Sequence, residues 1–476
     1  MRLIAALVLC ALAAGGTDSA AAQQPDTAGA AAGGAAVAPR DLAPAPGEPA
    51  TRLAVGAPAP APGAIPLSLE QAEELALERN ERVLIAREEI ERTKGLEREV
   101  RAASLPSLDV IYRYTRNVQR PVIFFDQGGE VQQVSIGEDN DNTVGLSLDQ
   151  TLFSRSVLAA NRAAGLAQEV SELGLEEVNE ELALDVRRTY YTVLLNAALI
   201  GVQELALEQA DARLGQVRQF FDVGTAAEFD VLTAEVEADN IRPLLITARN
   251  DYALALNELK RVVGLPLDEP VALTDSLTFD PVEMSFAQAL ELARLQRDDL
   301  RRQRATVQLQ QQAVAVERAQ AFPELSFNFD LTRRASSGDL VPATSDFSQS
   351  ASAGVELSFP VFDGRATEGR MRQARAVLAQ EELRQSALEE DVALEVQQAL
   401  QNVRAASEAT EAARATVSRA ARALEIAQTR FRNGLSTQLE LNDSELALTQ
   451  ARSTLARTLY QHNVARAELQ RAIGQR

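Results

Sequence analysis

Four stretches of the chain alternate between hydrophobic and polar side chains with a period of two, which is the spacing of a β-strand. The clearest begins at Pro323, after which odd positions are hydrophobic and even positions are polar through Thr332. A strand of about 10 residues with one apolar and one polar face is the length that a membrane-spanning β-barrel uses. We predict strands at about 107–117, 143–153, 324–333 and 351–362.

Each predicted strand places its hydrophobic side chains on a single face. A hairpin lying on a soluble core would show the same pattern, but four such strands at repeat-related places favour a membrane barrel. Ile111 is the one apolar residue that falls on a polar face. The side chains expected to face lipid are Leu108, Val110, Tyr112, Tyr114, Val144, Leu146, Leu148, Leu325, Phe327, Phe329, Leu331, Val355, Leu357 and Phe359.

Long proline-free stretches follow each strand pair, at 154–223 and 364–433. Small and apolar residues recur there at steps of three and four, the period of an amphipathic helix. A helix of this length would reach about 100 Å, which suits a tube or a coiled coil rather than a globular domain. Shorter return helices are predicted at 226–263 and 436–473, and Pro243 predicts a kink or break in the first.

The chain reads as two copies of one unit, 67–264 and 284–476, joined by a linker at 265–283. Phe221-Asp-Val-Gly224 in the first copy matches Phe431-Arg-Asn-Gly434 in the second. The loop between the strands is longer in the first copy, which is typical of an exposed loop.

The first 22 residues resemble a signal peptide, with an apolar run followed by Ala20-Ala21-Ala22. Residues 23–66 are rich in Ala, Pro and Gly and predict a flexible leader. Lipidation at Cys10 is an alternative, although Leu9 is bulky where such sites favour a small residue. The remaining chain has no apolar run that predicts a transmembrane helix, so export leaves a secreted protein or a β-barrel.

Composition argues against several classes of function. The formal net charge of −21 offers no basic surface for nucleic acid. His462 and Cys10 are the only histidine and cysteine, too few for a His-based or thiol-based metal site or a thiol enzyme. No pair of acidic residues stands out as a hydrolase site, so we predict neither an enzyme nor a cofactor.

Four strands in one sheet leave two open edges, and unpaired backbone groups at an edge are costly in lipid. The chain must therefore share a barrel with other copies. Two copies would give a filled barrel of 8 strands and three would give 12 strands with a lumen. The periodicity does not choose between them, although a conducting function favours three.

These features together resemble the TolC-type outer membrane factors, the exit ducts of tripartite efflux pumps and type I secretion systems. The resemblance is carried by the paired repeats, by the strand starts at Pro106 and Pro323, and by the aromatic-x-x-Gly turns ending at Gly224 and Gly434. It implies a mostly α fold in which long antiparallel helical hairpins form an α-barrel. That α-barrel continues into a 12-stranded transmembrane β-barrel built by a homotrimer, four strands per chain.

The resemblance also implies a place and a role. The trimer would be a passive conduit in the outer membrane of a Gram-negative-type bacterium, surrounded by lipid and with a long periplasmic portion. It would dock to a periplasmic adaptor protein and be powered by an inner-membrane transporter of the RND, ABC or MFS type. The alternative is a secreted or periplasmic coiled-coil scaffold or adhesin with no transport role. Scarce Met and His argue against a dedicated copper or silver duct.

Candidate site residues lie at the two helix-turn-helix tips. By resemblance, Glu440 and Asp443 would form an acidic ring at the periplasmic entrance, and Phe431 and Ser436 would take the place of the gate. Ser436 cannot form a salt bridge, so the family's closed-state lock is not assumed. Acids are also favourable at any helix N-terminus, which is the simpler interpretation of Glu440. The residues expected to contact the adaptor are Val223, Gly224, Thr225, Asp230, Asn433, Gly434 and Leu435.

Overall fold

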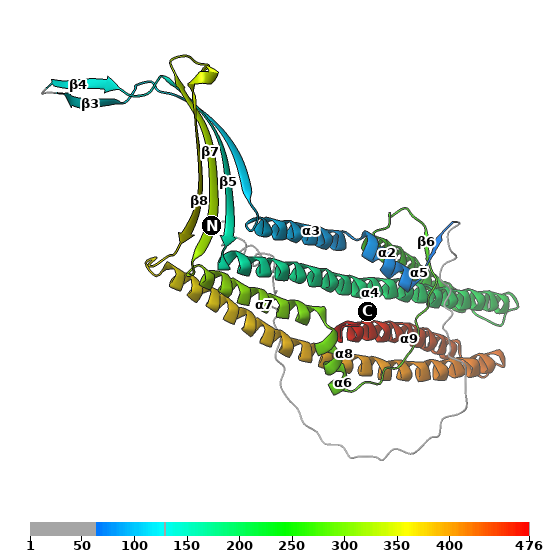
Figure 1. Ribbon diagram of the computed structural model, residues 1–476. Helices are drawn as coiled ribbons and strands as arrows, with labels where there is room; N and C mark the ends of the chain where they lie inside the picture. Colours follow the sequence, from blue (N-terminus) through cyan, green and yellow to red (C-terminus); the bar gives the residue numbers. More distant parts are fainter. Residues whose placement is uncertain (1–62, 128–129, 476) are drawn as a thin grey trace. The chain divides into compact units, whose positions relative to one another are not determined.

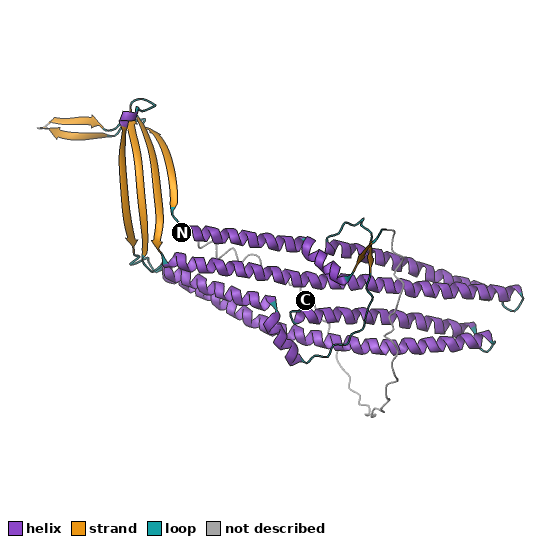
Figure 2. Ribbon diagram, turned by 45° about the vertical axis from the view of Figure 1, so that its right-hand side comes forward, coloured by secondary structure: helices purple, strands orange, loops and turns teal. Residues whose placement is uncertain are grey.

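Long α-helices and one four-stranded sheet dominate the computed structural model, which describes residues 63–127 and 130–475 (Figures 1 and 2). The predicted signal peptide, Cys10 and nearly all of the leader lie outside the described residues. The chain divides into two compact units. Unit 1 contains residues up to 83, 179–296 and 392 onward, and unit 2 contains 84–178 and 297–391. Each unit is therefore built from segments of both sequence repeats.

The two longest helices follow the proline-free stretches closely. The helix bounds are α2 (Leu69–Arg79), α3 (Glu81–Ala102), α4 (Arg155–Asp222), α5 (Glu228–Val263), α6 (Phe286–Gln296), α7 (Asp298–Ala319), α8 (Ala366–Arg432) and α9 (Gln438–Ala472). The two longest, α4 and α8, have 68 and 67 residues and each contributes one part to each unit.

Of the predicted kink or break at Pro243, the break does not occur, because helix α5 continues through this residue. Proline removes one backbone donor, and the carbonyl four residues earlier loses its partner. Pro243 and its neighbours Arg242 and Leu244 are exposed. Water can therefore satisfy that carbonyl, and the helix continues on both sides.

Unit 2 contains the four-stranded sheet. Its strands are β2 (Ser107–Arg116), β5 (Asn140–Phe153), β7 (Glu324–Ser337) and β8 (Phe347–Ser358), in the order β2-β5-β7-β8 with antiparallel pairing throughout. The contact between β5 and β7 joins the two repeats, and β2 and β8 are the edges.

Strand β8 begins and ends earlier than predicted. Pro360 has no backbone donor for the ladder, and Phe359 lies just past the strand end.

The pairing register places the predicted hydrophobic residues that lie within these strands on one face, whereas Phe359 lies outside the register. Leu148 of β5 lies opposite both Leu108 of β2 and Phe329 of β7, and the same face continues to Ala353 of β8. The other face is polar, with Asp109, Ser147, Asp330 and Ser352 in one row across the sheet. Ile111 lies on this polar face opposite Gly145, as the sequence predicts.

A second hairpin, β3 (Val122–Gln127) and β4 (Glu130–Ser135), occupies the stretch that the sequence analysis treated as a loop. It is joined to β2 and β5 by backbone hydrogen bonds from Asn117 to Asp139 and from Ile136 to Pro121. Arg120 supports this junction, with its Nε 2.8 Å from Oδ1 of Asp139. The prediction of a loop was wrong because the Gly128-Gly129 dipeptide between two β-prone runs is itself a hairpin signal.

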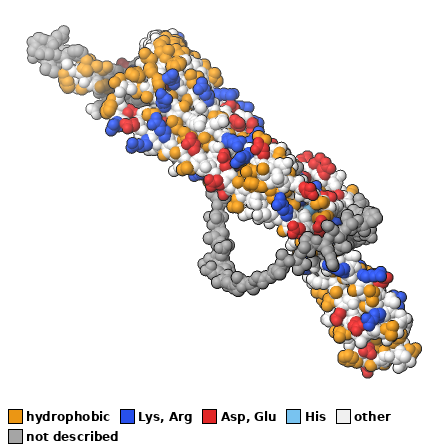
Figure 3. All heavy atoms as spheres, turned by 90° about the horizontal axis from the view of Figure 1, so that it is seen from below, with side chains coloured by type: hydrophobic (Ala, Val, Ile, Leu, Met, Phe, Trp, Pro, Cys, Tyr) orange, Lys and Arg blue, Asp and Glu red, His pale blue; other side chains and the backbone are white. Residues whose placement is uncertain are grey.

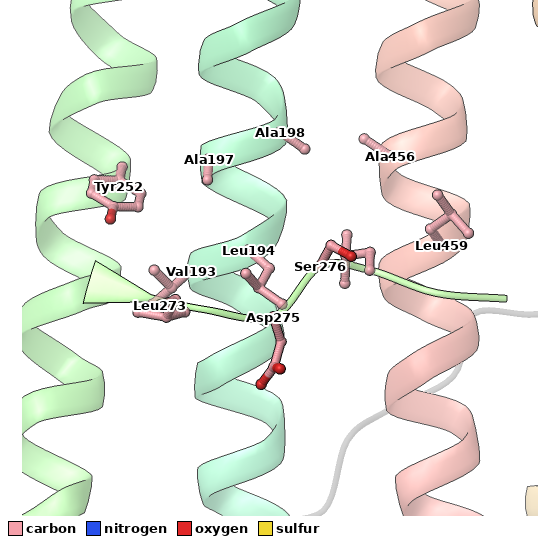
Figure 4. Close-up of a pocket in the computed structure, with 11 residues that line it drawn as sticks. Val193, Leu194, Ala197, Ala198, Tyr252, Leu273, Asp275, Ser276, Ala456 and Leu459 are labelled. Atoms are coloured by element: carbon pink, nitrogen blue, oxygen red, sulfur yellow. The ribbon is translucent and has the colours of Figure 1, made fainter. Parts of the chain in front are cut away.

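Unit 1 holds a small parallel sheet that the sequence did not predict, β1 (Ile65–Leu67) paired with β6 (Val271–Leu273). The linker that follows β6 crosses α4 between α5 and α9 and covers a cavity of about 60 Å³ (Figure 4). Tyr190 of α4 is fully buried here, and its hydroxyl is 2.9 Å from the Leu67 carbonyl and 2.8 Å from the Asp275 carboxylate. The linker is thereby fixed to the longest helix of the first repeat.

One expectation about the membrane needs correction. Within the part of the chain that the structure describes, α4 contains a window long and apolar enough to cross a membrane. Several large apolar side chains of α4, among them Leu182, Val186 and Val193, are buried inside unit 1. Packing inside unit 1 accounts for the buried part of this window, which is 39% of it.

Candidate functional site

Both helix-turn-helix tips belong to unit 1 and reverse the chain through the same turn. At the first tip, Gly224 has a φ of +75°, and the Thr225 amide donates to the Phe220 carbonyl over 2.8 Å. At the second tip, Gly434 has a φ of +69°, and the Leu435 amide donates to the Arg430 carbonyl over 2.8 Å. This bond pattern closes the end of a helix around a left-handed residue, a conformation that glycine adopts without steric cost.

The return helices are capped differently at the two tips. At the first, the Asp230 carboxylate accepts a hydrogen bond of 3.0 Å from the Ala227 amide. At the second, the Thr437 hydroxyl accepts one of 3.3 Å from the Glu440 amide. Asp230, which the sequence analysis assigned to the adaptor contact, therefore has a capping role in the turn itself.

The structure brings together two residues that the sequence analysis treated separately. The Ser436 hydroxyl donates to Oε2 of Glu440 over 2.5 Å. Glu440 lies in the first turn of α9, and both Glu440 and Asp443 are exposed. The exposed pair faces solvent next to the turn, where the helix dipole favours negative charge.

Phe431 contributes to packing at the second tip. Its half-buried ring lies against a cluster made by Leu424, Ala427, Leu441 and Leu448, which come from α8 and α9. The ring thus joins the outgoing and return helices directly beneath the turn.

Other apolar side chains at the tips are open to solvent. Val223 and Phe229 at the first tip are 71% and 75% exposed, and Leu435 and Leu439 at the second are 69% and 68% exposed. Exposed apolar groups beside ordered turns are typical of a protein-contact surface. In the view of Figure 3, acidic and basic side chains are interspersed among hydrophobic ones, without a field of a single sign.

A buried ionic cluster near the tips was missed by the sequence analysis. Arg213 of α4 is only 4% exposed, and its guanidinium lies 2.8 Å from Glu237 of α5 and 2.5 Å from Glu445 of α9. The guanidinium also donates to the Asn442 side chain, whose own nitrogen donates to Glu237 over 3.0 Å. The cluster joins helices of both repeats inside unit 1.

Burial raises the pKa of the Glu445 carboxyl above its ordinary value. Nearby Glu237 acts in the same direction, while Arg213 opposes both. No sequence motif marks this cluster, because its members are far apart along the chain. A lone arginine among apolar helix positions, between Ala212 and Leu214, was the only available signal.

The sheet in unit 2 exposes its apolar face. Side chains on the edge strands are the most open, with Val110 of β2 72% exposed and Leu357 of β8 68% exposed. Those on the central strands, such as Leu148 and Phe329, are half-buried between neighbouring strands. An apolar surface of this extent is unfavourable in water and matches the hydrocarbon of a bilayer.

The described residues contain no group of three or more His, Cys, Asp or Glu side chains placed to hold a metal ion. The candidate functional features of the described residues are two exposed tips, two long helix pairs and a sheet with an apolar face. These are the parts of an outer-membrane channel protein.

Comparison with known proteins gives the family. The model of the outer membrane efflux protein family matches residues 73–265 and 289–475, and the chain belongs to this family. The two matched segments fit the two repeats of the sequence. The family places the chain in the outer membrane as a channel.

Individual relatives agree with this assignment. The chain is 23% identical over 348 residues to the outer membrane protein TolC of Escherichia coli, covering 70% of each chain. It is 28% identical over 323 residues to the alkaline protease secretion protein AprF of Pseudomonas aeruginosa, covering 65% of this chain and 64% of the relative. The fold is similar to the outer membrane protein VceC of Vibrio cholerae, with a TM-score of 0.71, 17% identity, and coverage of 86% and 96%.

Proposed function

We propose that three copies of the chain form a passive conduit through the outer membrane. The observation that carries this proposal is the sheet, which has one apolar face and two unpaired edges, β2 and β8. In hydrocarbon each open edge would leave backbone groups without partners. Pairing β8 of one copy with β2 of the next removes both edges. Three chains of four strands give a barrel of 12 strands, wide enough for a water-filled lumen.

The helices would continue this barrel into the periplasm. Each repeat, 67–264 and 284–476, would contribute one long helix and its shorter partners to a tube of antiparallel helices. The signal peptide at 1–22, the leader at 23–66 and the linker at 265–283 complete the proposed organisation. Mixed acidic, basic and small side chains on these helices suit a tube surrounded by water rather than lipid.

The tips would form the periplasmic entrance. Glu440 and Asp443 of three copies would surround it with carboxylates, and Phe431 would hold the second tip in shape beneath them. The exposed residues at the turns, including Val223, Thr225 and Leu435, would contact a periplasmic adaptor. An inner-membrane transporter of the RND, ABC or MFS type would supply the energy. The secretion role in the name of AprF supports an export function.

The test is assembly and conduction of the purified full chain. Expected results are a heat-resistant trimer in detergent and stepwise currents in planar bilayers. Asp109→Cys in β2 is combined in turn with Ser350→Cys, Ser352→Cys or Gly354→Cys in β8. One of these three pairs should cross-link neighbouring copies. A monomer that is soluble without detergent and silent in bilayers would reject the proposal. Release from membranes by salt or urea would favour the scaffold alternative.

A further inference from the structure

Two arginines are the only charged side chains on the apolar face of the four paired strands. Arg116 ends β2, and Arg333 lies in β7 two residues beyond Leu331. The register places Arg116 in a row with Asn140 and Ser337, and Arg333 in a row with Tyr112. No acidic residue of these paired strands shares the face.

Both arginines lie toward the same end of the sheet. This is the end where β2 and β5 lead into the β3–β4 hairpin, whereas Leu108, Leu325 and Leu357 occupy the end nearest the helices (Figure 1). With the helices in the periplasm, the arginines are at the outer leaflet. An arginine on the lipid face is destabilising at the bilayer midplane and nearly neutral at the interface, so these two mark the outer interface.

Tyrosines accompany the arginines, as expected at a membrane interface. Tyr112 and Tyr114 share the face, and their hydroxyls donate to the side-chain oxygens of Asn142 and Asn140, each over 2.8 Å. Phe347 of β8 completes the row that contains Tyr114. We call this group of side chains the interface belt: Arg116, Arg333, Tyr112, Tyr114, Asn140, Asn142 and Phe347. Its two asparagine side-chain oxygens already accept hydrogen bonds from the tyrosine hydroxyls.

The interface belt has more hydrogen-bond donors than acceptors. Arg116 is exposed and has no acidic partner among the described residues, and Arg333 donates only to the Gln349 amide oxygen, over 3.2 Å. Asn142 is 4% exposed, and its side-chain nitrogen has no acceptor within the described part of the chain. By contrast, Arg334 on the polar face lies 3.4 Å from Asp141, and Arg120 at the hairpin base is paired with Asp139.

We propose that Arg116 and Arg333, framed by Tyr112 and Tyr114, bind the phosphate groups of outer-leaflet glycolipid. Guanidinium groups recognise phosphate through paired, charge-assisted hydrogen bonds, and tyrosines anchor at the level of the headgroups. The register separates the two arginines by about 13 Å along the strands and about 10 Å across them, so each contacts its own phosphate. This inference rests on the proposed closed barrel, in which three such interface belts would surround the channel.

The test measures lipid binding to the purified trimer by native mass spectrometry. The probes are lipid A carrying both phosphates and the same lipid A after removal of its phosphates. Wild-type trimer should retain the phosphorylated form at least tenfold better. Replacing both arginines (Arg116→Gln with Arg333→Gln) should remove most of that preference. The matched control, Arg113→Gln with Arg334→Gln, changes the same charge on the same two strands but on the polar face, and should leave the preference within twofold.

Equal retention of both lipids by wild-type trimer would overturn the inference without any variant. The inference would also be overturned if both double variants lost the preference for phosphorylated lipid A equally, or if neither lost it. Conduction by the same wild-type preparation separates this outcome from the proposed function. A conducting trimer without phosphate preference rejects only the lipid site, whereas a silent monomer rejects the barrel.

Discussion

Gly224 and Gly434 determine the chain reversal at the two tips. Both have left-handed backbone angles, and apart from their own chain neighbours no heavy atom of the described residues lies within 4 Å of the position that a Cβ would occupy. A substitution there meets open space, so its cost comes from the backbone alone. Strain of roughly 1–2 kcal/mol is expected for a residue other than glycine, and less for asparagine.

Replacing Gly434 by Val should shift the turn and abolish export while trimers persist. Gly434→Asn should retain most of the export, because asparagine tolerates the left-handed region. The measurement is complementation of a strain that lacks its own exit duct, with trimer abundance followed in parallel. Gly165→Ala, inside α4 with ordinary helical geometry, is the control and should have no effect. Full export by the valine variant would show that the turn shape is not required.

His462 is fully buried and holds the linker to α9. Its Nε2 lies 3.0 Å from the Asp280 carbonyl, and its ring is 4.8 Å from that of Phe279. Burial lowers the pKa of His462 below its ordinary 6.5, and nearby Arg466 and Arg414 also disfavour its protonation. The hydrogen bond to Asp280 opposes this shift.

Stability should therefore fall as the pH falls below about 6.5. In that range the unfolded chain binds a proton at His462 while the folded chain does not, so protonation favours the unfolded state. The stability contributed by neutral His462 is fully present above pH 6.5, and it decreases as the pH falls toward the lowered pKa of the folded state. Thermal unfolding of His462→Gln and wild type between pH 8 and pH 5 should show a smaller pH dependence in the variant. Parallel curves would contradict the assignment.

At the level of elements, the strands were predictable because a period of two directly encodes which face is apolar. Strand bounds were less certain: β7 continues to Ser337, and β8 is displaced because of Pro360. The β3–β4 hairpin was not predicted, because its turn signal is a single Gly-Gly dipeptide and the second repeat has a shorter loop at the equivalent place. The β1–β6 pair could not be predicted, since three-residue strands carry no periodicity.

The opposite faces of β7 allow a direct test of the membrane-facing side. Phe329→Arg should reduce the amount of heat-resistant trimer, because an arginine on the lipid face costs about 2–4 kcal/mol near the bilayer midplane. Asp330→Arg, one position along the same strand, faces the other side and should assemble normally. Both are measured by unheated gel electrophoresis of outer-membrane fractions. Equal assembly of the two variants would contradict the assignment of faces.

For the molecule as a whole, the repeats predicted two equivalent hairpins but not how the chain is partitioned. The two compact units cut across the repeats, because α4 and α8 are long enough to contribute to both. Among the tip residues, the turn glycines were recognisable from the repeated motif. The Ser436–Glu440 contact and the packing of Phe431 depend on side-chain positions that no motif specifies.

The ion preference of the channel is a property of the assembled molecule. Glu440→Gln together with Asp443→Asn should lower the cation preference, because both remove negative charge at the proposed narrow entrance. The measurement is the reversal potential in planar bilayers separated by a salt gradient, which should move toward zero. Glu228→Gln, an exposed first-turn acid at the other tip, is the control. An unchanged reversal potential in the double variant would place the selectivity elsewhere, such as near Asp109 and Asp330 on the polar face of the sheet.

The cluster around Arg213 has a consequence for how the gene can change over time. Its positive charge comes from the first repeat, and it is shared between Glu237 of that repeat and Glu445 of the second. Losing the arginine alone would leave Glu445, whose side chain is 15% exposed, and the more open Glu237 without their shared cation, which is destabilising. Substitutions at these three positions are therefore coupled between the two repeats. Relatives that lack this arginine should have replaced both acids as well.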